Sequence, residues 1–338
     1  MRQQQFEQVL QTAMRAQGVA VRLQLLLLAL LTQLAVRILS DNSCAGGGDV
    51  RCVVDHAADD GNGVASSSDL AHNESSHDAA DLVRHWGYDL DNGPALWPSS
   101  SPECGGRRQS PVALDTTSAT ASHQPRLHWF GWHNLPVSQH VANNGHTVSV
   151  KSTYLSEKEV PVVWLSDSER RYRLDSAHFH WGGSEHTLNG ERFAMEMHVV
   201  TFDRRFPSLE KAKSQKNGVL VLAYFFRASA TGSAALQQLV SRHLAAVVRP
   251  QTSRLVARPL RLSRLAHPFE KSFLLYQGSL TTPPCSQVVR WVLSKDVHSV
   301  SRQQLLLLSR LQNDKGKPLV RNWRPLQPLN GRTVTNVF

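Results

Sequence analysis

The sequence predicts a mostly β domain with a few short peripheral helices. Short runs rich in Val, Leu and aromatic residues recur from residue 82 onward, and several are bounded by glycine or proline. All eight tryptophans of the chain lie in the same region. With 338 residues, 41% of them hydrophobic, the chain is long and apolar enough to form a substantial core. We therefore predict one domain over residues 82–338.

Five apolar segments of this domain are typical of strands: 147–150, 160–165, 195–202, 219–226 and 287–293. The segment at 219–226 follows a glycine, and the segment at 287–293 follows two prolines, which punctuate the chain at these points. Residues 301–311 form one of the few convincing helical stretches. The predicted domain therefore consists mainly of strands, and its few helices are expected at the periphery.

The first 40 residues are typical of a signal peptide or an N-terminal signal anchor. An apolar run at 23–36 lies between Arg22 and Arg37. This run is shorter than the roughly 20 residues that a helix needs to cross the hydrocarbon of a bilayer. We expect a secreted or extracellular protein, attached to a membrane only if this segment remains uncleaved.

A polar linker is predicted at 41–81. It is rich in Asp, Ser, Gly, Ala and His and has almost no aliphatic clusters, so it cannot bury enough apolar surface to order itself. Asn73 begins a glycosylation sequon within it. The four cysteines of the chain are an even number, as expected for disulfides in an oxidising compartment, and three pairings are open.

The chain is basic, with 37 Lys and Arg residues against 27 Asp and Glu residues. Arginines recur between residues 246 and 266, but no interleaved aromatic residues and no nucleic-acid-binding motif accompany them. We interpret these arginines as a solvated basic face and predict no nucleic-acid partner.

A histidine pair and a third histidine suggest a metal site. His178 and His180 are two residues apart in a predicted strand, so their side chains project from one face. His198 follows a Gly-Gly turn and is expected on a neighbouring antiparallel strand. Three neutral imidazoles and a water form a catalytic zinc site, and Glu196 can accept the second ring N–H of a ligand histidine. From these residues alone, histidines with purely structural roles remain an equal alternative.

Motifs in a fixed order extend this pattern along the chain. They are HWGY (85–88), NGP (92–94), QSP (109–111), NNGH (143–146), AHFHWG (177–182), SEHT (184–187), EMH (196–198), GSLTTPP (278–284) and NWRP (322–325). Over residues 84–338 the sequence resembles the alpha-class carbonic anhydrases, and in particular secreted, disulfide-containing animal-type members. The resemblance implies a single domain built on a large, mainly antiparallel twisted β-sheet with short peripheral helices.

The resemblance also implies an activity and a metal. Members of this family hydrate carbon dioxide reversibly to bicarbonate and a proton through zinc-bound hydroxide, so the implied cofactor is Zn2+. The matching zinc ligands are His178, His180 and His198. Thr281 matches a residue whose hydroxyl accepts a hydrogen bond from the hydroxide and donates one to Glu185. His146 matches the proton shuttle, and an ordinary imidazole pKa of roughly 6.5 suits that role.

Further residues take roles from the same resemblance. Glu196, Asn322 and Ser176 match positions that support the ligand histidines, but Ser176 stands where a Gln is common, which weakens the support of His178. The matching substrate-site residues are Val200, Val221, Leu280, Thr282, Val289 and Trp291. Tyr88 and Asn144 match residues that order the waters leading to His146. Cys104 and Cys285 match a disulfide of exported members.

The implied partners are carbon dioxide and bicarbonate, with sulfonamides and anions as inhibitors, and we expect a monomer. Two alternatives stay open. The first is a carbonic-anhydrase-like binding module without activity, which typically arises when a ligand histidine is replaced; all three are present here. The second is a zinc esterase, although no separate substrate-binding motif supports it as the main role.

Overall fold

The computed structural model describes residues 86–338. The predicted signal segment (1–40), the predicted linker (41–81) and the sequon at Asn73 lie outside the described residues. Within the described part of the chain, no helix combines the length and the apolar character that a membrane crossing requires.

Strands form most of the regular structure of the described residues. Their bounds are β1 (Ala113–Leu114), β2 (Thr120–Ser122), β3 (Leu127–Phe130), β4 (Ser138–Asn143), β5 (Val148–Thr153), β6 (Val162–Leu165), β7 (Tyr172–Trp181), β8 (Thr187–Leu188), β9 (Met195–Asp203), β10 (Val219–Ser229), β11 (Thr252–Leu255), β12 (Phe273–Gly278), β13 (Val289–Ser301) and β14 (Thr335–Val337). All five strands predicted from apolar segments are present; four of them differ from the prediction by three residues or fewer at each end, and the fifth, β13, extends to Ser301.

The helices are short. They are α4 (Trp97–Ser100), α5 (Leu209–Ala212), α6 (Ala234–Leu236), α7 (Leu262–Leu265) and α8 (Arg302–Leu308), with 3₁₀ turns η1 (Pro102–Gly105) and η3 (Leu244–Ala246) and a π turn η2 (Gln237–Ser241). The helix predicted at 301–311 is α8, and Ser301 caps it because its side chain accepts a hydrogen bond from the Gln304 backbone N–H.

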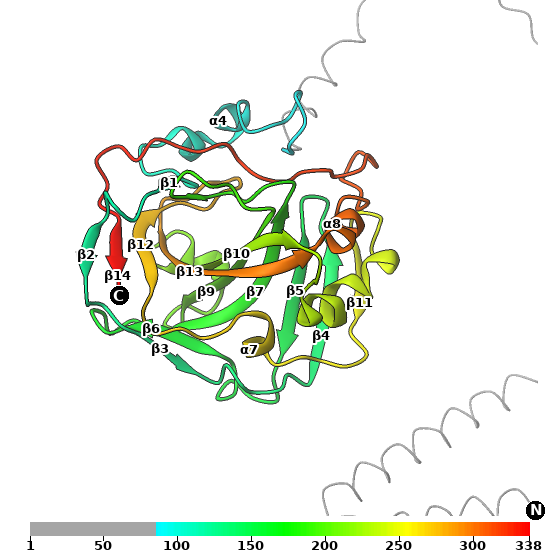
Figure 1. The fold of residues 1–338 in the computed structure, drawn as a ribbon, viewed down its shortest axis with the longest axis horizontal. Coiled ribbons are helices and arrows are strands. Elements are labelled where there is room, and N and C mark those ends of the chain that lie inside the picture. Colours follow the sequence, from blue (N-terminus) through cyan, green and yellow to red (C-terminus); the bar gives the residue numbers. More distant parts are fainter. Residues whose placement is uncertain (1–85) are drawn as a thin grey trace, which may run out of the picture. The chain divides into compact units, whose positions relative to one another are not determined.

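One large sheet of the described residues organises the domain. Its main path runs β11-β4-β5-β7-β9-β10-β13-β12-β14-β2, while β6 joins β3 to β7. Figure 1 shows α4 along one side of this sheet, and β2 with β14 far from β11. Most pairings are antiparallel, as predicted, but β10–β13 and β14–β2 are parallel, so the sheet is mixed. The mostly β prediction is confirmed.

Alternation along the central strands divides the core into two layers. On β10, Leu220 and Leu222 join one buried cluster, whereas Val219 and Val221 join the other. Side chains of successive residues point to opposite faces of a sheet, so both faces of β10 are covered. Residues 219–226 of the strand are therefore apolar and buried throughout, and β10 pairs with β9 on one edge and with β13 on the other.

Candidate metal centre

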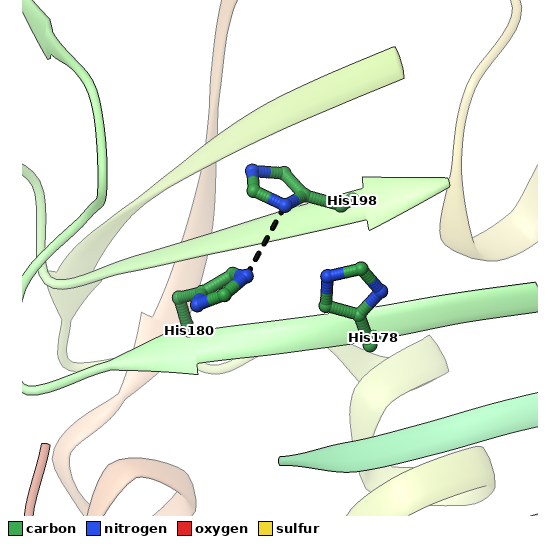
Figure 2. Close-up of side chains that lie close together, drawn as sticks. All are labelled: His178, His180 and His198. Atoms are coloured by element: carbon green, nitrogen blue, oxygen red, sulfur yellow. Dashed lines mark hydrogen bonds between the residues drawn. The ribbon is translucent and has the colours of Figure 1, made fainter. Parts of the chain in front are cut away.

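Two neighbouring strands carry the three histidines. β7 supplies His178 and His180, and β9 supplies His198, with His178 directly opposite His198 in the antiparallel register. Figure 2 shows the two β7 imidazoles on one face and the β9 imidazole facing them. One ring nitrogen from each histidine lies within 4.8 Å of the others. The predicted pairing of these strands is confirmed.

Hydrogen bonds on the far side of two rings fix their tautomers. His180 Nδ1–H donates to the backbone oxygen of Asn322 over 2.7 Å, because a carbonyl oxygen can only accept. His198 Nε2–H donates to Glu196 Oε1 over 2.7 Å. The lone pairs of these neutral rings are therefore at His180 Nε2 and His198 Nδ1, which face each other.

These lone pairs suit a metal ion. His180 Nε2 and His198 Nδ1 are 3.1 Å apart, and two lone pairs cannot hydrogen-bond to each other. Ligands about 2.0–2.1 Å from a tetrahedral zinc ion would be about 3.3 Å apart. Burial lowers the pKa of all three histidines, that of His180 to about 3, so the rings are neutral as metal ligation requires. The residues fit zinc.

Glu196 ties the centre to a buried chain of hydrogen bonds. Its Oε1 accepts from His198 and from His186 Nδ1–H, and its Oε2 accepts from the His186 backbone N–H. His186 Nε2 accepts from the Tyr276 hydroxyl over 2.6 Å, and that hydroxyl lies 2.8 Å from Ser110 Oγ. Burial opposes ionisation of Glu196, but His186 and His198 hold its pKa well below the ordinary value.

Glu185 is a second buried carboxylate at the centre. Its Oε2 lies 3.4 Å from His180 Nε2, and its Oε1 accepts from the Arg324 backbone N–H over 2.9 Å. Burial, followed by the charge of Glu196, raises the pKa of Glu185 to about 8, while the Thr281 hydroxyl and Arg324 act in the opposite direction. Thr281 is itself buried on the loop after β12. The two predicted catalytic residues are thus brought together.

Asn322 holds the end of β7 from a distant segment. Its side chain accepts from the Trp181 backbone N–H and donates to the oxygens of Phe179 and His146. Its backbone oxygen accepts from His180, as described above. Asn322 therefore orients the His180 ring and links β7 to the turn that carries His146.

His146 follows a tight turn after β4. Asn144 Oδ1 accepts from the backbone N–H groups of His146 and Thr147, which fixes the turn. The imidazole stacks on Trp86 with ring centroids 3.7 Å apart, and His146 Nε2 lies 3.3 Å from Asp314 Oδ2. Asn144 was predicted to order waters. Its side-chain oxygen accepts these two hydrogen bonds within the turn.

The predicted substrate-site residues gather in one place. Val200, Val221, Val289 and Trp291 belong to one buried cluster, and Leu280 packs against it. The Trp291 ring centroid lies 4.8 Å from that of His198, so the apolar cluster reaches the histidines. Thr282 lies next to Thr281 on the partly buried loop, where its backbone oxygen accepts from the Cys285 N–H.

The side chains of Ser176 and Tyr88 contact residues other than the three histidines. The Ser176 hydroxyl donates to Asp175 Oδ2 over 2.7 Å, beside a register shift of β7 between Leu174 and Ser176. Tyr88 packs against Trp86 and Trp97, and burial raises the pKa of its hydroxyl well above the ordinary value.

The disulfide predicted between Cys104 and Cys285 is present.

Several contributors to the site were not assigned roles from the sequence. His186 directly follows Glu185 in the SEHT motif, and a histidine next to a carboxylate residue indicates a candidate site residue. Arg324 and Asp314 lie far along the chain from the residues that they contact, so local sequence pattern contains no indication of those contacts.

Known proteins are similar to this chain over most of its length. The family model of eukaryotic-type carbonic anhydrases matches residues 92–338. A Caenorhabditis elegans protein named putative carbonic anhydrase 3 is 31% identical over 263 residues, covering 76% of this chain and 99% of that protein. Human carbonic anhydrase 3 is 32% identical over 270 residues, covering 76% of this chain and 100% of that protein. The chain therefore belongs to the eukaryotic-type carbonic anhydrase family.

Proposed function

We propose that this protein is a zinc-dependent enzyme that reversibly hydrates carbon dioxide to bicarbonate and a proton. The observation that carries the proposal is the facing pair of lone pairs on His180 and His198, with His178 completing the set. Zinc held by these three neutral imidazoles would supply a Lewis-acidic charge that generates a nucleophile from water near neutral pH.

Thr281 and Glu185 orient the nucleophile in this proposal. A hydroxyl both donates and accepts, so Thr281 can donate to a carboxyl oxygen of Glu185, which accepts in either protonation state, and can accept from the attacking water. The water then keeps a lone pair directed at the carbon atom of the substrate, which is the kind of alignment that raises reaction rates. The burial of both residues keeps this orientation fixed.

The apolar cluster near His198 holds carbon dioxide. Carbon dioxide is small and uncharged. The apolar side chains of Val200, Val221 and Trp291 are therefore more favourable surroundings for it than bulk water. Thr282 and the Thr281 backbone would contact the anionic product. Sulfonamides and small anions are the inhibitors that we expect at the same place.

Each turnover releases one proton, and His146 is the residue proposed to pass it to buffer. Its ring is 18% exposed, so it is in contact with solvent while remaining tied to the turn that Asn322 fixes. We also propose that the protein is exported to an oxidising compartment and that it is a monomer. The Cys104–Cys285 disulfide supports the assignment to an oxidising compartment.

The test is stopped-flow carbon dioxide hydration by the full chain before and after zinc removal with a chelator. We expect one zinc per chain and an activity that chelation abolishes and added zinc restores. One bound zinc with no hydration would contradict the proposal and favour a binding module. Ester hydrolysis that exceeds carbon dioxide hydration in the same sample would favour a zinc esterase.

A further inference from the structure

A groove without a role in the proposed function lies beside α8. The helix lines it with one face, since Arg302, Leu306 and Ser309 are spaced four and three residues apart. Phe193, before β9, and Val320, in the C-terminal segment, also line it. We call this hollow the α8 groove. Its volume is about 760 Å³, within the range of about 300–1,000 Å³ that is usual for small-molecule sites.

Large apolar side chains of the α8 groove are exposed to solvent. Leu306 is 60% exposed and Val320 is 63% exposed. They do not belong to the core, and the buried residues of α8 are Gln304 and Leu308. Contact between apolar surface and water is unfavourable, so exposed apolar side chains that line one hollow indicate a binding site.

The α8 groove has an excess of positive charge. Its charged lining residues are Arg192, Arg227, Arg302 and Glu191. Arg227 neutralises Glu191, because it donates to both carboxylate oxygens over 2.8 to 3.1 Å. Within residues 86–338, the Arg302 guanidinium makes no hydrogen bond, ion pair or ring contact. Arg192 and Arg302 therefore remain without a paired carboxylate.

Arg192 is held in place at the groove. Its guanidinium lies 4.4 Å from the centroid of the Trp323 ring, and its Nη1 donates to the Ser184 backbone oxygen. These contacts leave the N–H groups on Nε and Nη2 available as donors. A fixed guanidinium loses little freedom when an anion binds, and its planar shape matches a carboxylate.

We propose that the α8 groove binds an aliphatic monocarboxylate. The alkyl chain would lie against Leu306 and Val320, and the carboxylate would pair with Arg302, while Arg192 adds a second positive charge. A charge-assisted pair with Arg302 favours the carboxylate over an alcohol, and the excess positive charge disfavours an alkyl cation. The groove contains none of the three site histidines, so this inference does not depend on the proposed function.

Isothermal titration calorimetry of the full chain with decanoate, kept below its micelle concentration, tests the proposal. We expect one site per chain. Decanol should bind about tenfold more weakly, because it cannot form the charge-assisted pair. Butyrate should bind at least about 100-fold more weakly, because most of the alkyl chain is missing. Equal affinity for decanoate and decanol, or no decanoate binding, would overturn the proposal.

Two variants with matched controls locate the ligand. Arg302→Gln should weaken decanoate binding about tenfold, and Leu306→Gln about fivefold. Arg310→Gln removes an exposed arginine just after α8 that does not line the groove, and Leu255→Gln changes a leucine that is 55% exposed on β11. Both controls should keep the parent affinity. The same affinity in Arg302→Gln and Arg310→Gln would exclude the groove as the carboxylate site.

The same titration after zinc removal distinguishes the groove from the metal centre. We expect decanoate to bind the zinc-free chain, and Arg302→Gln to weaken this binding equally. Binding that disappears with zinc would place the carboxylate at the histidines and overturn the inference. Sedimentation equilibrium tests the remaining occupant, because a parent dimer that Leu306→Gln dissociates would show that a second copy covers the groove. A zinc-loaded chain without hydration activity would overturn the proposed function and leave these readouts unaffected.

Discussion

Three N–H groups converge on the Glu196 carboxylate, two from His186 and one from His198. We predict that Glu196→Gln weakens zinc binding about 10- to 100-fold, as is usual when a partner of a ligand histidine is lost. A neutral amide has one acceptor oxygen, so its NH₂ group would face one of these donors. Competition with a chelator of known affinity measures the zinc Kd.

The control for this change is Glu191→Gln, which removes an exposed carboxylate paired with Arg227 of β10. It should leave the zinc Kd unchanged, since an exposed ion pair contributes little and does not touch the histidines. Equal zinc affinity in the Glu196 and Glu191 variants would show that Glu196 does not support His198.

Thr281 offers a second test with a matched pair. Thr281→Val keeps the shape of the side chain but removes the hydroxyl, so we expect kcat/KM for carbon dioxide hydration to fall about 100-fold while zinc content stays at one per chain. Thr281→Ser keeps the hydroxyl and should retain most of the rate. If the Val variant matched the parent, an orienting role for this hydroxyl would be wrong.

The grouping of the three histidines could be predicted from the sequence because their geometry is local, but their assignment as zinc ligands came from the family resemblance. Alternation places His178 and His180 on one face, and the connection between β7 and β9 brings His198 opposite His178. The surroundings could not be predicted in the same way. Asn322, Arg324 and Asp314 come from one C-terminal segment whose path over the sheet depends on the completed tertiary structure. Ser176 turns to Asp175 beside a strand irregularity that the side-chain pattern does not reveal.

At the scale of elements, β9 ends in a buried acid. The side chain of Asp203 is inaccessible to solvent, and Arg170 and Arg205 each donate to its Oδ2 over 2.6 Å. Burial alone would raise the pKa of Asp203, but the hydrogen bonds from Arg205 and Arg170 outweigh burial and hold it below the ordinary value. The carboxylate therefore joins the end of β9 to the chain before β7.

This pKa predicts a pH dependence of stability. The unfolded chain binds a proton at Asp203 more readily, so the stabilisation is fully present above the unfolded pKa of about 4 and is lost as pH falls through the lower folded pKa. Asp203→Asn should lower the free energy of unfolding at pH 7 and flatten its decline below pH 4, as measured by urea unfolding.

Glu157→Gln provides the comparison, because Glu157 is 76% exposed in its ion pair with Arg173. Screening by solvent makes such a pair weak, and the pH profile should match that of the parent chain. A parent-like profile for Asp203→Asn as well would exclude Asp203 as a source of the acid sensitivity.

Five of the strands could be predicted from apolar runs, but their exact extent and their partners could not. The run predicted at 287–293 continues as β13 to Ser301 through polar residues, because pairing with β10 holds its backbone. The parallel pairing of β10 with β13 joins segments about seventy residues apart, and neither segment contains a local signal for the other.

At the scale of the whole molecule, the Cys104–Cys285 disulfide joins residues 181 positions apart. Closing so long a loop restricts the unfolded chain, and the chain-entropy relation gives a stabilisation of about 5 kcal/mol. We predict that Cys104→Ser with Cys285→Ser lowers the free energy of unfolding by about 2–5 kcal/mol, as measured by urea unfolding under oxidising conditions.

The chain contains its own control for this prediction. Cys44→Ser with Cys52→Ser removes the other two cysteines and leaves the 104–285 link in place. This control should keep the stability of the parent domain. An unchanged unfolding midpoint in the Cys104 and Cys285 double variant would mean that the link contributes no net stability to the folded domain.

The position of β14 between β12 and β2 has a consequence for synthesis. β2 is made early and β14 is encoded more than two hundred residues later, yet β14 pairs with both β2 and β12. During translation, the edge of β12 therefore stays unpaired until residues 335–337 have left the ribosome. An unpaired strand edge can pair with another chain, so β12 is exposed to such pairing from the synthesis of Gly278 to that of Thr335, and β2 is exposed for longer still, from Ser122 onward.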